Sequence, residues 1–465
     1  MTNPRGAAPE PFVKGSSKPF CVVRCVRTPK VLSMPRNLGF LEACPNPPFY
    51  LNLFLSVSKI CNISFDNQNK IGINVLIAII GGPNKGKSTL FNALTLGNAA
   101  VANYPFTTID PNRGVAYASK NCPHVHLNRQ CNPNNSKCEE GVRKIPINVL
   151  DVAGLVEGAH EGKGMGNQFL SDVAASDCII LLADASGSTD LDGNPCTPGS
   201  NDVLQDIEII ETELDAWYLD VFKRNALKAR GKKIEDFANL LSGLKITMDD
   251  LNYVVRILEL NPQDVWSWEK EDMKEASKII RERTKPIVIA ANKVDSEFAE
   301  KNVLKLKEFY GKRYGVFPIA ADSELALRKA NEKGMIKYNG KTFEITTPNL
   351  PSQLISALEK INKNIIEKWG STGVQALLDH CVFTLLNQIV VYPVEDEVHF
   401  ANHFGKVLPD AILLKNGSKS IDLAGKIHSD LATHMLHAVD AEKKMRIAKD
   451  AVLHDGQVVK IVSTK

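Results

Sequence analysis

The sequence has few cysteines, no long apolar segment and almost no charge imbalance. Ten cysteines among 465 residues are too few for a disulfide scaffold and are typical of reduced thiols in a cytoplasmic protein. No segment approaches the roughly 20 apolar residues that a membrane-spanning helix needs, and the best candidate, residues 49–57, is too short. Lysine and arginine number 56 against 53 acidic residues, so the net charge favours neither nucleic acid nor a membrane. We therefore expect a cytoplasmic protein without membrane contact.

The chain is long enough to divide into several domains, and 44% of its residues are hydrophobic. Residues 1–71 carry many Pro, Asn and Ser without periodicity, so we interpret them as a flexible or non-native extension. Between 72 and 350, short apolar runs alternate with helical stretches, which predicts an α/β domain with a doubly wound, mostly parallel sheet. The predicted strands are residues 73–80, 145–152, 178–184, 286–293 and 315–321.

An insertion separates the third and fourth of these strands, because about 100 residues far exceed what a crossover requires. Apolar residues at helical spacing from Val203 to Val221 predict an amphipathic helix, with Asp206 and Glu211 among the acidic residues on its other faces. Thr247 and Asp250 match the capping box of another helix. The sequence thus predicts a helical insertion at about 200–283.

Two further regions follow the α/β domain. Residues 351–387 contain two helical stretches separated by Gly370 and Gly373, and we interpret them as a helical connector. Residues 388–465 mix short apolar strands with one helix. They are expected to form a small separate α+β domain.

The segment GGPNKGKSTLFNALT, residues 81–95, follows an apolar run and opens a predicted helix. It satisfies G-x-x-x-x-G-K-S, in which glycines let backbone N–H groups point at phosphates and the helix N-terminus adds positive potential. We expect Lys87 to neutralise β- and γ-phosphate oxygens and Ser88 to bind Mg²⁺. The predicted nucleotide contacts of this loop are Gly81, Gly82, Pro83, Asn84, Lys85, Gly86, Lys87, Ser88 and Thr89.

Two loops are expected to respond to the γ-phosphate. Asp151 closes the second predicted strand, where a carboxylate can hold Mg²⁺ through water, and Gly154 follows with a backbone N–H for the γ-phosphate. Upstream, Thr107 and Thr108 lie in a predicted loop, and we favour Thr108 as the hydroxyl that reaches Mg²⁺. Because loss of the γ-phosphate releases both loops, the pattern predicts a switch as well as a hydrolase.

The base-reading motif is ANKVD, at the end of the fourth predicted strand. Asp295 can accept hydrogen bonds from the N1 and N2 donors of guanine, while Asn292 and the stem of Lys293 brace the ring. Adenine lacks the matching donors, so the motif predicts GTP rather than ATP. The backbone N–H groups expected to meet guanine O6 belong to Ala320, Ala321 and Asp322.

Together with NYPFTTIDPNRG and DVAGLVEGAHEGKGMGNQFL, these motifs resemble the Obg-related GTPases, and specifically the YchF-like branch in its archaeal form. The tail, with IDLAGKIHSDL and AVLHDGQVVKIVS, is similar to a TGS domain, the β-grasp module of that branch. The resemblance covers about 72–465. It implies a P-loop NTPase fold with a helical insertion, a TGS domain at 388–465, binding of GTP and GDP, and the ribosome or ribosomal RNA as partner. We expect a monomer.

Two features depart from the relatives. YchF-like proteins of the bacterial and eukaryotic type resemble ATPases because their base-reading motif is altered, whereas Asn292, Lys293 and Asp295 are intact here. An adenine-using protein is still an open alternative. Lys85 stands where relatives usually carry a small apolar residue, and it is expected to add a charge beside the phosphate loop.

Leu155 occupies the position at which Ras-type enzymes place the glutamine that orients the attacking water. Water positioning must therefore come from backbone, a partner or an ion. In several related GTPases the asparagine of G-x-x-N-x-G-K-S, here Asn84, helps to hold K⁺; it can equally be a side chain that stabilises the loop. We expect slow GTP turnover raised by K⁺ and by a partner, with Lys87, Thr108, Gly154 and Asn84 as catalytic residues. The alternative is a nucleotide-dependent ribosome-binding scaffold with negligible hydrolysis.

A polar excursion, CPHVHLNRQCNPNNSKC, precedes the strand that ends at Asp151. Three cysteines and a histidine can bind Zn²⁺ tetrahedrally and fix a loop that is too polar to form its own core. The spacing is irregular and lacks a C-x-x-C pair, so a surface loop with unligated thiols is the alternative. The candidate ligands are Cys122, His124, Cys131 and Cys138.

Overall fold

The computed structural model describes residues 75–96, 112–152 and 172–464, and the structural statements below refer to these residues. They belong to one compact unit, Gln68–Lys465. The predicted extension at 1–71 lies outside the described residues.

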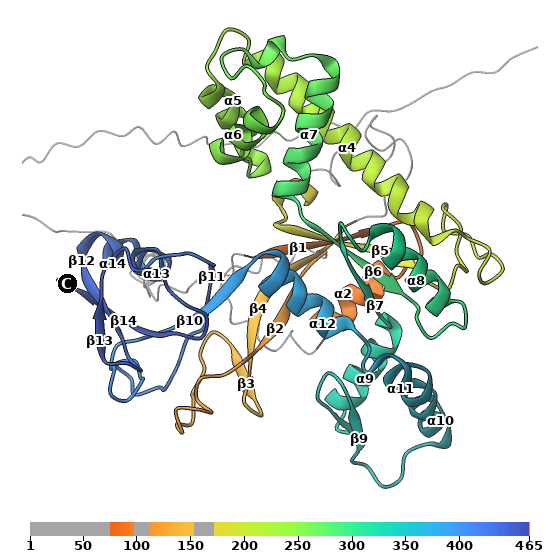
Figure 1. The fold of residues 1–465 in the computed structure, drawn as a ribbon. Helices are drawn as coiled ribbons and strands as arrows, with labels where there is room; N and C mark the ends of the chain where they lie inside the picture. Colours follow the sequence, from red (N-terminus) through yellow and green to blue (C-terminus); the bar gives the residue numbers. More distant parts are fainter. Residues whose placement is uncertain (1–74, 97–111, 153–171, 465) are drawn as a thin grey trace, which may run out of the picture. The chain divides into compact units, whose positions relative to one another are not determined.

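A seven-stranded sheet forms the centre of the first domain (Figure 1). Its main order is β2-β4-β1-β5-β6-β7, with β3 paired to β4. The neighbours from β4 to β7 are parallel, whereas β2 and β3 run antiparallel to β4. The strands are β1 Leu76–Gly81, β2 Arg113–Asn121, β3 Lys137–Glu139, β4 Val142–Asp151, β5 Cys178–Asp184, β6 Ile287–Asn292 and β7 Gly315–Pro318.

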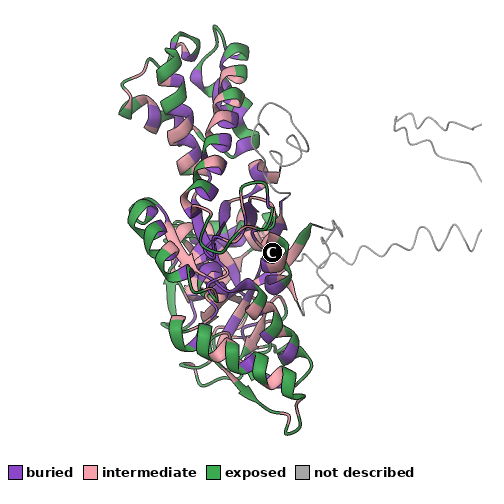
Figure 2. Ribbon diagram, turned by 90° about the vertical axis from the view of Figure 1, so that its right-hand side faces the viewer, coloured by how far each residue is buried: buried purple, intermediate pink, exposed green. Residues whose placement is uncertain are grey.

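The central strands are buried on both faces, which is why their sequences are continuously apolar rather than alternating. Successive residues of β1 point into two different cores. Ile77 and Ile79 pack with α2 (Lys87–Thr95) and α12 (Val374–Asp379), while Ala78 and Ile80 pack on the side of α4 (Val203–Lys228) and α8 (Ala299–Tyr310). Figure 2 shows the buried strands between helices whose outer faces are exposed.

The region between β5 and β6 contains α4 followed by α5 (Ile234–Leu241), α6 (Met248–Ile257) and α7 (Lys270–Thr284). The predicted capping box is present, because Thr247 and Asp250 each accept a hydrogen bond from the other residue's backbone. The prediction that Asp206 and Glu211 lie on outward faces is wrong, since both are buried. Neighbouring elements cover these faces of α4 and bring partners: Lys85 for Asp206, and Arg313 and Tyr314 for Glu211.

The C-terminal domain is a five-stranded sheet of order β11-β10-β14-β12-β13 in which β10 and β14 are parallel. Leu423 and Ala424 of α13 pack against one face of this sheet. Its elements are β10 Gln388–Val394, β11 Ile412–Lys415, α13 Ser420–Ile427, α14 Ser429–His434, β12 Met435–Asp440, β13 Met445–Ile447 and β14 Val458–Ser463. The connecting region contains α9 Ala321–Glu332, β8 Ile336–Tyr338, β9 Phe343–Ile345, α10 Ser352–Ile361, α11 Glu367–Trp369 and α12.

The predicted fold class, a P-loop α/β domain with helical additions and a C-terminal β-grasp domain, is confirmed. The sequence analysis did not predict β2 or β3. Both are edge strands with polar residues, and they gain their structure from pairing with the apolar β4 rather than from a pattern of their own. Within the described part of the chain, no helix is both long and apolar enough to span a bilayer.

Candidate nucleotide-binding site

The described residues of the predicted nucleotide site lie at one edge of the sheet, where the parallel strands end. The strand register aligns Ile79 of β1 with Asp151, the last residue of β4. It also aligns Asp184, the last residue of β5, with Asn292, the last residue of β6. In open α/β sheets the carboxyl ends of the strands form the ligand-binding edge. Residues that are far apart in sequence are thereby brought to a common edge.

The phosphate loop connects β1 to the N-terminus of α2. Gly86 is the N-cap residue and has φ +100°, a conformation that glycine adopts without strain. A Cβ at this position would also lie 2.3 Å from Asn292 Nδ2. No side chain caps α2, so the N–H groups of its first turn point outward as donors for an anion.

Lys87 begins α2, and its ammonium donates to the carbonyl oxygen of Gly82 at 2.8 Å. This contact folds the side chain back over the loop. Burial lowers the pKa of Lys87, and the nearby carboxylate of Asp151 partly opposes that shift. A phosphate oxygen can take over from the Gly82 carbonyl as acceptor and strengthen the charged form.

Asp151 is the candidate carboxylate for Mg²⁺. Its Oδ1 atom is buried and accepts no hydrogen bond from any residue that the structure describes. A buried carboxylate oxygen without a donor fits a water-bridged cation. Ser88, exposed in the first turn of α2, is the second candidate ligand. The third, Thr108, and the γ-phosphate contact Gly154 lie outside the described residues.

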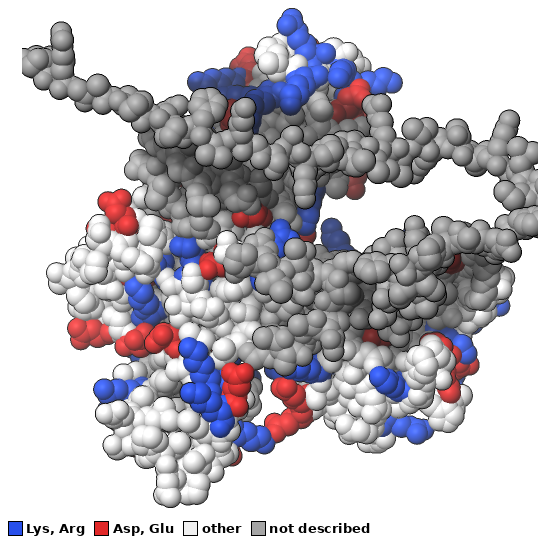
Figure 3. Space-filling view, turned by 180° about the vertical axis from the view of Figure 1, so that it is seen from behind, with Lys and Arg blue, Asp and Glu red and all other residues white. Residues whose placement is uncertain are grey.

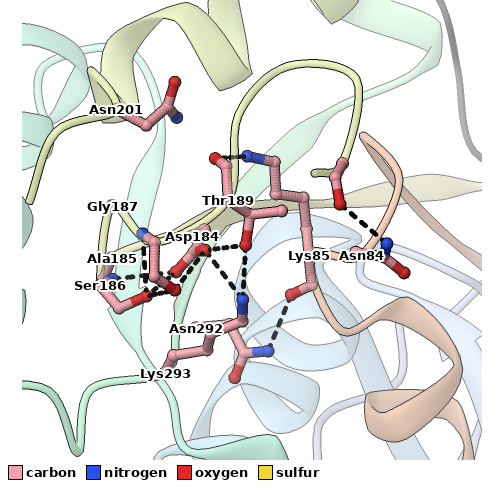
Figure 4. Close-up of polar contacts among 12 residues, drawn as sticks. Asn84, Lys85, Asp184, Ala185, Ser186, Gly187, Thr189, Asn201, Asn292 and Lys293 are labelled. Carbon is pink, nitrogen blue, oxygen red and sulfur yellow. Dashed lines mark hydrogen bonds and ion pairs between the residues drawn. The ribbon is translucent and has the colours of Figure 1, made fainter. Parts of the chain in front are cut away.

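Asn292 connects three parts of the site, as Figure 4 shows in part. Its Nδ2 donates to the carbonyl of Lys85 in the phosphate loop at 3.0 Å. Its Oδ1 accepts from the N–H of Ala321, at the start of α9, at 3.1 Å. The buried amide therefore fixes the phosphate loop relative to the segment after β7, and it is a positioning group rather than one exposed to the base.

Asp295 is exposed three residues after Asn292, in the turn that follows β6. The expected donors to guanine O6 are arranged differently from the prediction. The N–H of Ala320 donates to the carbonyl of Thr372, and that of Ala321 is engaged by Asn292. Asp322 is the second residue of α9, a position whose N–H has no acceptor within a helix. Asp322 is therefore the one of the three whose N–H these contacts do not occupy.

A polar network that the sequence analysis missed lies behind the base-reading motif. Asp184 accepts hydrogen bonds from Lys293 Nζ at 2.8 Å, from Thr189 Oγ1 at 2.5 Å and from Ser186. Burial alone raises the pKa of Asp184, but these hydrogen bonds outweigh it and the pKa is lowered. Lys293 has φ +64°, and Figure 4 shows its ammonium bonded to both Asp184 and Thr189. The sequence offered one signal for this network, because Asp184 is the only charged residue of the apolar strand β5 and stands at its end.

Lys85 does not add a charge beside the phosphates as predicted. Its side chain is buried, donates to the carbonyl of Thr189 at 2.8 Å and forms an ion pair with Asp206 of α4 at 2.9 Å. Asn84, with φ +56°, donates from Nδ2 to the carbonyl of Gly193 at 2.9 Å. The loop between β5 and α4 thus contacts the phosphate loop at two consecutive residues.

The other predicted cluster is also assembled. The ligand atoms of Cys122, His124, Cys131 and Cys138 all lie within 4.8 Å of one another. They come from the segment that joins β2 to β3 and from β3 itself, not from the nucleotide edge of the sheet.

Three family profiles match successive parts of this chain. They are a 50S ribosome-binding GTPase over residues 76–215, the G4 motif-containing domain of YGR210-like Obg-like GTPases over 290–396, and a TGS domain over 405–463.

Known proteins are similar over most of the chain. An uncharacterized GTP-binding protein of Methanocaldococcus jannaschii is 44% identical over 394 residues, which are 83% of this chain and 99% of that protein. Obg-like ATPase 1 of Homo sapiens is 30% identical over 78% of this chain and 81% of its own length. The crystal structure of a GTP binding protein from Pyrococcus horikoshii OT3 covers 84% of this chain and all of that one, with 34% identity and a TM-score of 0.67. The Schizosaccharomyces pombe YchF GTPase structure, at 19% identity, 84% and 99% coverage and a TM-score of 0.50, shares the fold.

Proposed function

Because this chain belongs to the Obg-related, YchF-like family of P-loop GTPases, we propose that it binds GTP with Mg²⁺ and hydrolyses it to GDP and phosphate as a molecular switch. The observation that carries the proposal is the arrangement around Asn292. One buried amide links the phosphate loop to the segment after β7, and the same motif places the carboxylate of Asp295 in the exposed turn that follows β6.

Guanine selection follows from the chemistry of Asp295. A carboxylate offers two acceptors, and guanine presents two adjacent donors, N1–H and N2–H₂, whereas adenine presents an acceptor at N1. Leaving the carboxylate without donors costs free energy, so the site discriminates against adenine. The aliphatic stem of Lys293, held by Asp184 and Thr189, supplies an apolar surface for one face of the ring.

The cation and the lysine act on the phosphates. Mg²⁺ held by Ser88, by Thr108 and through water by Asp151 would neutralise charge on the β- and γ-phosphate oxygens. The N–H groups at the start of α2 and the ammonium of Lys87 orient the same oxygens. Gly154 and Thr108 belong to the two loops proposed to sense the γ-phosphate. In this proposal, hydrolysis releases both loops.

The side chain of Leu155 supplies no hydrogen-bonding group for the attacking water, so a cation is the proposed aid. The Nδ2 of Asn84 donates to Gly193. The other end of the same amide, Oδ1, is the atom that would ligate K⁺ near the phosphates. A monovalent cation there stabilises charge that develops during transfer.

A ribosomal or RNA partner is supported by the profile for a 50S ribosome-binding GTPase and by one surface. The end of α4 and the turn that follows it carry five exposed basic residues, of which Arg224 is ion-paired with Asp220 one helical turn earlier. Lysine and arginine predominate over the helical insertion at the top of Figure 3, with acidic side chains beside them, whereas the two signs are mixed more evenly over the rest of that face. The exposed basic residues of this surface are Arg224, Lys228, Arg230, Lys232 and Lys233. Such a cluster suits contacts with phosphate backbones.

One experiment separates guanine from adenine use. A fluorescent GTP analogue bound to the purified full chain should be displaced by GTP and GDP at concentrations at least about 100-fold below those of ATP. Equal displacement by ATP would favour the activity named for Obg-like ATPase 1 and would refute the proposed role of Asp295.

A second experiment separates the switch from a scaffold. GTP turnover is measured with and without ribosomes under multiple-turnover conditions. Stimulation by ribosomes supports the switch. Ribosome binding that requires GTP, without any turnover, would support the scaffold instead.

A further inference from the structure

The cysteine and histidine cluster beside β3 has the geometry of a metal site. His124 Nδ1 lies 3.3 Å from Cys131 Sγ and 3.5 Å from Cys138 Sγ, and the thiols of Cys122 and Cys131 are 4.0 Å apart. In a tetrahedral zinc site with three thiolates and one imidazole, the ligand atoms are about 3.5 to 3.8 Å from each other. These three separations lie close to that range, and all four ligand atoms lie within 4.8 Å of one another.

The ligands come from three separate places on the chain. Cys122 directly follows β2, His124 lies in the turns at 123–128, Cys131 lies in the irregular segment after them, and Cys138 is the middle residue of β3. Residues 123–136 contain neither helix nor strand. The four side chains nevertheless converge, and Cys122 and Cys131 are buried. A polar loop with this convergence gains a core when a metal binds.

This loop is also the surface on which the C-terminal domain docks. The N–H groups of Asn132 and Asn134 donate to the carbonyls of Val407 and Pro409 at 2.8 and 2.7 Å. The side chain of Asn135 donates to Ala411 O at 3.0 Å and accepts from Ala411 N at 2.9 Å. All of these contacts are made by residues 132–135, which lie between Cys131 and Cys138.

A buried arginine also connects this loop to the C-terminal domain. Arg143 of β4 is opposite Cys138 in the strand register and donates to Ser136 Oγ at 3.0 Å and to Leu408 O at 2.8 Å. Its guanidinium also lies over the ring of Tyr392 in β10. Cys122 and Cys131 share an apolar cluster with residues of the C-terminal domain, among them Tyr392 and Leu408.

We propose that Cys122, His124, Cys131 and Cys138 bind one structural Zn²⁺ and that the metal fixes the loop that docks the C-terminal domain on the GTPase domain. Four protein ligands close the coordination sphere and leave no open position for a substrate, so the site is structural rather than catalytic. Zinc has no redox chemistry, and binding requires only that the thiols release their protons.

Metal content is the first test. The full chain, purified under reducing conditions, should contain about one equivalent of zinc by elemental mass spectrometry. Cys138→Ser should lose most of it, whereas Cys196→Ser should keep it, because Cys196 lies outside the cluster and its thiol donates to the Gly187 carbonyl. Less than a tenth of an equivalent in the parent chain, or equal loss in the two variants, would overturn the assignment.

Replacement of zinc by Co²⁺ in the parent chain keeps the test independent of folding defects in a variant. Tetrahedral ligation by three thiolates should give strong sulfur-to-cobalt charge-transfer absorption. A spectrum without these bands would contradict the ligand set, as would a disulfide among the three cysteines in native protein.

Amide hydrogen exchange tests the docking role. Removal of zinc with a chelator should raise exchange at least about tenfold in peptides that cover 131–136, because the Asn132 and Asn134 amides donate across the contact. A peptide that covers β5 reports whether the whole domain has unfolded. If zinc leaves and exchange at 131–136 is unchanged, the docking role is wrong even though the metal site stands.

Discussion

Lys85 of the phosphate loop forms a buried ion pair with Asp206 of α4, with Nζ 2.9 Å from Oδ1. Asp206 also accepts the backbone N–H of Asp184 at 3.0 Å and the side-chain amide of Asn201 at 3.2 Å. Burial raises the pKa of Asp206, and the charge of Lys85 opposes that shift. The contact joins the phosphate loop to the first helix of the insertion. A movement of one element that keeps this ion pair must therefore displace the other.

Lys85→Met should lower the free energy of unfolding by about 3 to 5 kcal/mol, because it leaves the Asp206 carboxylate buried without its cation. Urea unfolding at pH 7 measures the loss. The double variant Lys85→Met/Asp206→Asn should recover a large part of it, since no charge is then left unpaired.

Lys305→Met is the matched control. Lys305 Nζ is 2.9 Å from Asp202 Oδ1, the same separation, but both side chains are more than 40% exposed. This substitution should cost less than about 1 kcal/mol. Equal losses at the two positions would contradict the assignment of the stabilisation to burial.

Asp295→Asn should convert guanine preference into xanthine preference. An amide in place of the carboxylate offers one acceptor and one donor, and xanthine carries a carbonyl where guanine carries its N2 amine. Affinity for GTP should fall by about 100-fold or more, while xanthosine triphosphate gains. Displacement of a fluorescent nucleotide by each triphosphate measures both changes. Equal weakening of both would indicate a structural role for Asp295 instead.

The contiguous parts of the site could be predicted from the sequence, and the parts assembled by tertiary packing could not. Gly86 and Lys87 lie in one short motif whose spacing fixes their backbone geometry. Thr189 and Gly193, by contrast, reach the phosphate loop only because the β5–α4 segment folds back across it. Nothing in the sequence around Thr189 and Gly193 indicates that this segment contacts the phosphate loop.

The direction of the Lys85 side chain could not be predicted from the sequence either. Lys85 is adjacent to Gly86, so the sequence placed its charge beside the phosphates, yet its side chain extends to Asp206. Asp206 in turn occupied a polar position of an amphipathic helix, which predicted exposure. Each charged side chain can be buried because the other one neutralises it. The two residues are about 120 positions apart in the sequence, so no local pattern indicates the pair.

Asn84→Ala distinguishes a potassium ligand from a loop-stabilising side chain. If Asn84 Oδ1 ligates K⁺, turnover in K⁺ should fall to the rate in Na⁺, and the rate in Na⁺ should stay within about twofold of the parent. If the side chain acts only through its hydrogen bond to Gly193, both rates should fall together. Steady-state GTP turnover in the two salts, at equal ionic strength, measures the difference.

Asp379 should make stability depend on pH in an unusual direction. It ends α12 and accepts the backbone N–H of Ser119 in β2 at 2.7 Å and the side-chain amide of Gln375 at 3.0 Å. Burial raises its pKa to about 6, although these hydrogen bonds and the nearby charges of Lys144 and Lys120 oppose the shift. The folded state therefore holds the proton more tightly than the unfolded chain, whose aspartates titrate near pH 4.

The sign follows from that difference. The stability contributed by the Asp379 proton is complete below about pH 4 and is lost as the pH rises through about 6. Asp379→Asn keeps an oxygen acceptor for Ser119 and carries no charge at any pH. Its free energy of unfolding relative to the parent should therefore rise between about pH 4 and about pH 6, by on the order of 2 kcal/mol, and level off above that range, as measured by urea unfolding.

Asp202→Asn supplies the opposite case. The Leu204 N–H and Lys305 lower the pKa of Asp202, so its charged form contributes stability that is present at neutral pH and is lost in acid. The stability of the parent relative to Asp202→Asn should rise as the pH rises from acid toward neutrality, whereas its stability relative to Asp379→Asn should fall between about pH 4 and about pH 6. A difference between the parent and Asp379→Asn that does not change over this range would show that the Asp379 carboxylate titrates as an exposed group does. The hydrogen bond from Ser119 of β2 to Asp379 of α12 would then not depend on protonation of the Asp379 carboxylate.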